Sequence, residues 1–213
     1  PIMEGEELAR VIVDSYKSFC EEIYYSQNPD FEHYLTISAI RLGGKINDLA
    51  EAVDQLSTML IKVLGTEGTT AQELLIYSIT ASREESEELN PYVTPYAYID
   101  LMDFMENLQD LLNDEKNLPL YMKQLIDKTE DILAMKDEVI ISEYHGSARP
   151  NANGLSIAFY KLPEAMSYNT YDTDYKDYNS ETGEGREVQF INDTSWDEFL
   201  QTYYLKAALI TVP

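Results

Sequence analysis

The chain has 213 residues, enough to bury a sizeable core in one domain or two small ones. Hydrophobic residues make up 44% and charged residues 25%, which places the chain among globular rather than disordered proteins. The formal net charge of −24 repels phosphate backbones and anionic headgroups, so nucleic acid and membrane surfaces are excluded as expected partners and basic peptides are favoured. No apolar run approaches the roughly 20 residues that cross a bilayer, so we expect no membrane span.

Helical periodicity dominates the first 135 residues. Apolar residues recur at steps of three and four over residues 6–25, which predicts an amphipathic helix. Its apolar face is made by Leu8, Val11, Ile12, Phe19 and Ile23. The other predicted helices cover residues 45–64, 98–112 and 119–135, with one more beginning near residue 70. The charged run at its end, residues 83–88, is expected in solvent, and alternating β-formers predict one strand at 34–42.

The last third of the chain mixes strands with a helix. Strands are predicted at residues 138–144 and 155–160, and a helix at 194–206 carries the only tryptophan. Residues 167–187 are rich in Tyr, Asp, Asn and Gly with almost no aliphatic side chains, which is typical of a long loop.

The order of these elements, mostly helices with a few strands, predicts an α+β, predominantly helical fold rather than an alternating βαβ one. We expect a helical bundle with a small sheet or hairpin. Residues 1–135 would form the bundle and its one strand, and residues 136–213 would add the remaining strands, the acidic loop and the terminal helix to one compact unit.

Thiol and imidazole groups are scarce. Cys20 is the only cysteine, so the chain can form neither an internal disulfide nor a Cys-based metal site. The adjacent Glu21 and Glu22 would raise the pKa of its thiol, and we expect a structural, half-buried cysteine. His145 follows a predicted strand, but no cysteine follows it, and His33 is expected at the surface. The residues therefore predict no catalytic group in this chain.

Calcium is the one cofactor that the acidic loop suggests. Asp172, Asp174, Asp177 and Asn179 supply oxygen ligands at spacings that a hard cation could use. The segment lacks the central Gly of a calcium loop, and its spacing slips between Asp174 and Asp177. A solvated acidic loop is the competing interpretation.

Several runs resemble, in order, the C-terminal region of the clostripain family of cysteine peptidases. These runs are residues 7–16, 35–40 followed by 46–52, 98–104, 154–157 and 196–200. The resemblance implies that the intact enzyme is an Arg- or Lys-directed cysteine endopeptidase with a caspase-like core. The family's catalytic His, its nucleophilic Cys and the acidic residue that reads the basic side chain lie N-terminal to the matching region, and none maps onto a position here.

By that resemblance the chain is a C-terminal structural or accessory domain whose partner is the upstream catalytic region of the same precursor. It would be a processed or excised part, or a relative without the dyad, and would be secreted or belong to the cell envelope. Such a domain should expose an apolar patch when isolated. The alternative is a non-catalytic binding module that takes a basic peptide or a glycan on its Tyr/Asp-rich loop, residues 167–187.

Overall fold

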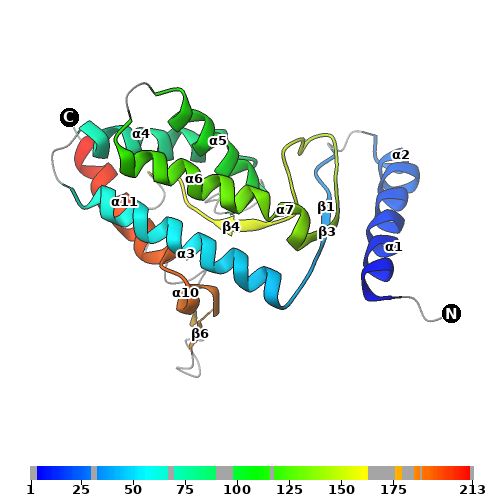
Figure 1. Ribbon diagram of the computed structural model, residues 1–213. Coiled ribbons are helices and arrows are strands. Elements are labelled where there is room, and N and C mark those ends of the chain that lie inside the picture. Colours follow the sequence, from blue (N-terminus) through cyan, green and yellow to red (C-terminus); the bar gives the residue numbers. More distant parts are fainter. Residues whose placement is uncertain are drawn as a thin grey trace.

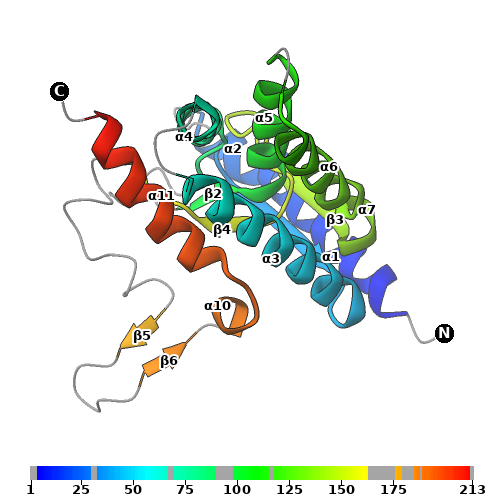
Figure 2. The same cartoon turned by 60° about the vertical axis from the view of Figure 1, so that its left-hand side comes forward.

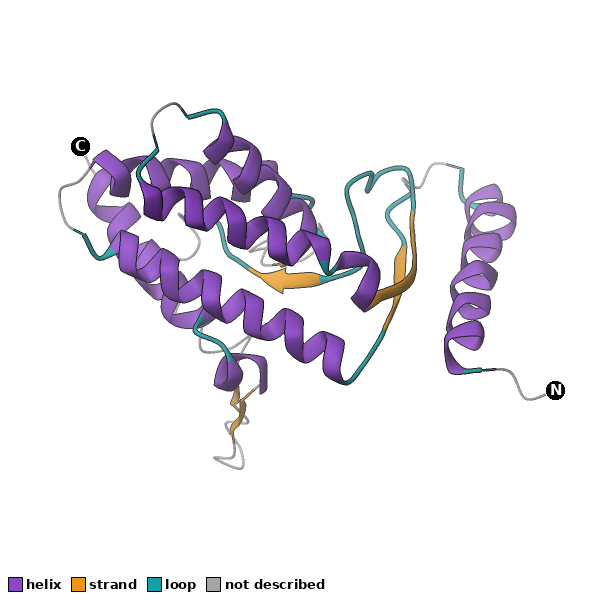
Figure 3. Ribbon diagram, in the orientation of Figure 1, coloured by secondary structure: helices purple, strands orange, loops and turns teal. Residues whose placement is uncertain are grey.

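The computed structural model describes residues 4–29, 33–66, 70–89, 98–115, 118–162, 176–178, 185–187 and 189–211. The fold is α+β and mostly helical, as the sequence predicts (Figures 1 and 3). The helices are α1 Gly5–Ser18, the π-helical turn η1 Phe19–Tyr24, α2 Tyr25–Gln27, α3 Gly44–Leu64, α4 Thr70–Glu85, α5 Leu101–Asn113, α6 Leu120–Ala134, α7 Lys136–Val139, α10 Gln189–Asp193 and α11 Trp196–Thr211. The strands are β1 Thr36–Ile40, β2 Tyr98–Asp100, β3 Ile140–His145, β4 Ser156–Ala158, β5 Lys176–Tyr178 and β6 Gly185–Glu187.

The main core lies within a bundle of α3, α4, α5, α6 and α11. Helix α3 buries one side chain at every third or fourth position, and α11 runs along it, as Figure 2 shows. The apolar stripe of α3 consists of Leu49, Val53, Leu56, Leu60 and Leu64. Side chains at these spacings share one helix face, so the sequence periodicity alone determines which side of α3 is buried.

A second, smaller core joins α1 to a ribbon of two strands. Strand β1 pairs antiparallel with β3, and in Figure 1 this ribbon lies between α1 and the helical bundle. The small core contains Val13, Cys20, Tyr25 and Tyr144. These residues, and not the apolar face expected from the sequence, hold α1 in place.

The apolar face predicted for the first helix is largely outside the core. Its five side chains, Leu8, Val11, Ile12, Phe19 and Ile23, are each between 43% and 51% exposed. The sequence pattern marks an apolar surface correctly, but the ribbon covers only the neighbouring side of the helix.

Two predictions of secondary structure are wrong. The first three residues of the helix expected at 98–112 form β2, because Asp100 ends the extended segment and caps α5. The six described residues of the expected loop at 167–187 form an antiparallel pair, β5 with β6.

The charged run at 83–88 is expected from its sequence to lie in solvent, but part of it is buried. Arg83 is only 1% exposed, and its Nε donates a hydrogen bond to the carbonyl oxygen of Phe159, while Nη1 lies 3.4 Å from Glu88. Lys161 completes the cluster, with its Nζ 2.8 Å from Glu88. A buried guanidinium must be hydrogen-bonded and paired, and these contacts tie the end of α4 to the segment after β4.

No described helix is both long enough and apolar enough to cross a membrane.

The start of α11 gives the chain a predictable pH dependence. One carboxylate oxygen of Asp197, Oδ1, is buried without a hydrogen-bond partner in the part of the chain that the structure describes. Burial, reinforced by a hydrogen bond to Glu198, raises the pKa of Asp197 to about 6 from its ordinary 3.8. The folded state therefore binds this proton more tightly than the unfolded state, so the free energy of unfolding falls as pH rises from about 4 through about 6.

We expect Asp197→Asn to raise the free energy of unfolding at neutral pH and to flatten its slope between about pH 4 and pH 6. Denaturant titrations of both proteins across this range measure the slopes. Asp103, whose pKa burial likewise raises to about 6, remains in both proteins and contributes equally to each curve. Identical slopes would show that the pKa of Asp197 is the same in the folded and the unfolded chain.

Candidate functional site

The lone thiol is enclosed in the small core. Cys20 lies in η1 and is fully buried. Burial is the main cause that raises the pKa of its thiol; a hydrogen bond with Tyr16 lowers it, and the charge of Glu21 raises it further. A nucleophilic cysteine needs an accessible, electropositive setting, and Cys20 has neither property.

The two histidines lie at the same end of the β1–β3 ribbon. Nδ1 of His145 lies 2.9 Å from Oε2 of Glu143, so a carboxylate orients this half-buried imidazole. His33, expected at the surface, instead stacks half-buried on Tyr25, with ring centroids 3.7 Å apart. Gly146 is required here because a Cβ at this position would lie 2.1 Å from the carbonyl oxygen of His33.

The ribbon separates Cys20 from His145. Side chains alternate between the two faces of a strand, so Glu143 and His145 face away from Tyr144, which packs with Cys20. An acid–base pair without a nucleophile on its own face cannot carry out nucleophilic catalysis. Within the described residues, the oriented imidazole therefore lacks a thiol partner.

The calcium candidates are mostly outside the described residues. Asp172, Asp174 and Asn179 are among those that the structure does not describe, and Asp177 lies in β5, where it pairs in register with Arg186. Across the described ranges, no group of three or more His, Cys, Asp or Glu side chains could hold a metal ion.

A buried carboxylate that the sequence does not single out organises the centre of the molecule. Asp100 is fully buried, and its Oδ1 accepts hydrogen bonds from the backbone N–H groups of Met102 and Asp103, which begin α5. Its Oδ2 accepts from the N–H groups of Asn153 at 2.7 Å and Gly154 at 3.2 Å. Burial is the largest cause and raises the pKa of Asp100 above its ordinary value, although the hydrogen bonds from Asn153, Asp103 and Met102 act in the opposite direction. The one usable sequence signal is an Asp directly before an apolar helical run, which is typical of a helix N-cap.

Next to Asp100 lies a second buried polar pair. Nη1 of Arg149 donates to Oε1 of Glu87 at 3.0 Å, and the guanidinium lies 5.0 Å from the centroid of the Tyr34 ring. The backbone N–H of Glu87 donates to Oδ2 of Asp103 at 2.6 Å. Nε and Nη2 of Arg149 are buried without a hydrogen-bond partner among the described residues. The contacts of Arg149 and Glu87 fix the turn after β3 against the segment that precedes β2.

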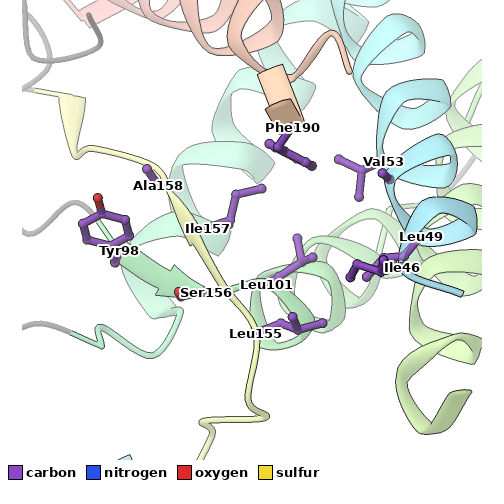
Figure 4. A pocket seen from close by; sticks show the side chains of 11 residues that line it. Ile46, Leu49, Val53, Tyr98, Leu101, Leu155, Ser156, Ile157, Ala158 and Phe190 are labelled. Carbon is purple, nitrogen blue, oxygen red and sulfur yellow. The ribbon is translucent and has the colours of Figure 1, made fainter. Parts of the chain in front are cut away.

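Two cavities flank β4. The larger, about 320 Å³, lies between α3, the β2–β4 pair and Phe190 of α10 (Figure 4). Among its described lining residues, Ser156 and Tyr98 alone bring a polar side-chain atom, so it suits an apolar side chain and offers no acid–base pair. The smaller, about 220 Å³, lies between the ribbon and residues 152–156 and is lined by Glu143, Ser38 and Thr36.

One of three comparisons with known proteins finds a relationship. The model of the clostripain family matches residues 2–203, nearly the whole chain. Neither the comparison with curated proteins nor the comparison with solved structures finds a match.

Proposed function

Because the chain belongs to the clostripain family, we propose that it is the C-terminal structural domain of an Arg- or Lys-directed cysteine endopeptidase whose catalytic Cys and His lie in an upstream region. Family membership supports a peptidase-related role. The separation of Cys20 from His145 by the ribbon supports placing the catalytic dyad elsewhere.

The observation that carries this proposal is the open edge of the β1–β3 ribbon, which α1 covers on one face. The N–H of Gly146 donates to the carbonyl oxygen of Leu35, so hydrogen-bonded and non-hydrogen-bonded residue pairs alternate along the two strands from this point. The backbone groups of Thr36 and Ser38 on β1 therefore point away from β3. No other described strand pairs with either edge of the ribbon. Two-stranded ribbons are marginal by themselves, and open edges readily accept another strand.

In the intact peptidase, strands of the upstream region would extend this ribbon, and α1 would cover one face of the joined sheet. The domain would thereby brace the catalytic sheet and border the substrate cleft. The net charge of −24 suits this place, because the substrates implied by the family carry Lys or Arg.

A fluorogenic assay with Arg- and Lys-containing peptides tests the proposal. The chain alone should be inactive, and cleavage should appear when it is mixed with the separately expressed, folded upstream region. Cys20→Ala should leave the activity of the mixture unchanged, because this thiol takes no part in the chemistry.

Two results would contradict the proposal. One is cleavage by the chain alone that Cys20→Ala abolishes. The other is a folded upstream region that is as active without this chain as with it. Binding of the peptide by the chain, without any cleavage in the mixture, would favour the binding-module alternative.

A further inference from the structure

Helix α1 and the π-helical turn η1 that follows it carry an apolar surface that the ribbon does not cover. We call the five half-exposed side chains Leu8, Val11, Ile12, Phe19 and Ile23 the α1 stripe. Beside the stripe, Val13 and Cys20 are buried against the ribbon, so apolar residues continue from the buried side of the helix to the exposed one. A contiguous apolar patch of this kind marks an interaction surface, unlike single exposed side chains.

Carboxylates border the α1 stripe. Glu7 and Asp14 are seven residues apart and lie along one line of the helix, next to Val11. Glu4 and Glu22 are exposed near the two ends of the stripe. Neither these four side chains nor Glu21 forms an ion pair among the described residues.

The basic residues of α1 lie elsewhere. Helical spacing places Arg10 and Lys17 on the side opposite Leu8 and Phe19. The border of the stripe is therefore acidic, and it would repel a second copy of the same surface. It would attract a surface whose apolar side chains are bordered by Lys or Arg.

We propose that the α1 stripe docks the upstream catalytic region of the same precursor through an apolar surface bordered by Lys or Arg. This inference rests on the proposed function and identifies the surface through which the two parts join. Apolar burial supplies the affinity, and the carboxylate border speeds the encounter and sets the orientation.

Calorimetric titration of this chain with the folded upstream region tests the surface. Ile12→Glu places an unpaired carboxylate in the stripe and should weaken binding by about tenfold or more. Ile12 is 51% exposed, so the variant should fold, and circular dichroism checks this. The double variant Glu7→Lys with Asp14→Lys should slow association and reduce its dependence on salt. Leu120→Glu is the matched control, because Leu120 is 73% exposed on α6, away from the stripe, and should leave binding unchanged.

The possible outcomes distinguish a failure of this inference from a failure of the proposed function. If the upstream region binds the wild-type chain and Ile12→Glu binds equally well, the stripe is not the interface, although the proposed function stands. If the folded upstream region does not bind the wild-type chain, both fall. If sedimentation shows a dimer of this chain that Ile12→Glu dissociates, the occupant is a second copy and the proposal is overturned.

Discussion

Replacing Asp100 by Ala should lower the free energy of unfolding by about 3–5 kcal/mol. The fully buried carboxylate accepts five hydrogen bonds: from the backbone N–H groups of Met102, Asp103, Asn153 and Gly154, and from Nδ2 of Asn153. In the Ala variant these donors lose their acceptor, and α5 loses its N-cap. Hydrogen bonds to a charged acceptor are stronger than neutral ones, and leaving buried donors without a partner is costly. Urea titration followed by far-ultraviolet circular dichroism measures the loss.

Asp100→Asn is the control for this prediction. The amide keeps the shape of the side chain and one acceptor oxygen, so it should retain part of the N-cap or part of the contact to Asn153. We expect its loss to be smaller than that of the Ala variant. If Asp100→Ala lowers the free energy of unfolding by less than about 1 kcal/mol, water replaces the carboxylate. Asp100 would then not be what holds the start of α5 to Asn153 and Gly154.

The sequence predicts α3 well because the signal is local. Leu49, Val53, Leu56 and Leu60 recur at steps of three and four, and the helix observed at Gly44–Leu64 buries all four. The predicted helix at 45–64 differs from it by one residue. Any structure that covers one side of this helix must bury the same side chains, so no knowledge of the partner is needed.

The burial of Asp100 and Arg83 could not be predicted from a local pattern of this kind. The acceptor role of Asp100 depends on Asn153, which lies 53 residues later in the chain. Arg83 resembles the solvated charges around it in the sequence, but its Nε donates a hydrogen bond to the carbonyl oxygen of Phe159, 76 residues away, in the interior. The local sequence pattern predicts that a charged residue lies in solvent. Whether a particular charged residue is buried instead depends on contacts with residues far away in the sequence.

Helix α1 lies between these cases. The periodicity identifies apolar positions at Ile12 and Phe19, and both are indeed on one surface. It cannot state which part of that surface this chain covers, because the ribbon that buries Val13 is formed by residues far away in sequence. The exposed remainder therefore becomes visible only in the folded chain.

Replacing Phe159 by Ala should destabilise the chain by about 3–5 kcal/mol, the range typical of a buried aromatic side chain. Phe159 is fully buried, and five aromatic rings surround it with centroids between 5.3 and 6.2 Å away. These rings belong to Phe104, Trp196, Phe199, Tyr203 and Tyr204. Four of the five rings belong to α11, so the cavity left by the substitution lies where the terminal helix joins the bundle. Denaturant titration gives the loss.

Tyr77→Ala provides the comparison, because Tyr77 is 65% exposed on α4 and its removal should change stability by no more than about 0.5 kcal/mol. The near-ultraviolet circular dichroism signal should weaken in Phe159→Ala alone, since Trp196 loses an edge-to-face neighbour at 6.0 Å. A Phe159→Ala protein as stable as Tyr77→Ala would show that α11 is held mainly by α3. The aromatic cluster would then contribute little, and truncating it would leave the bundle intact.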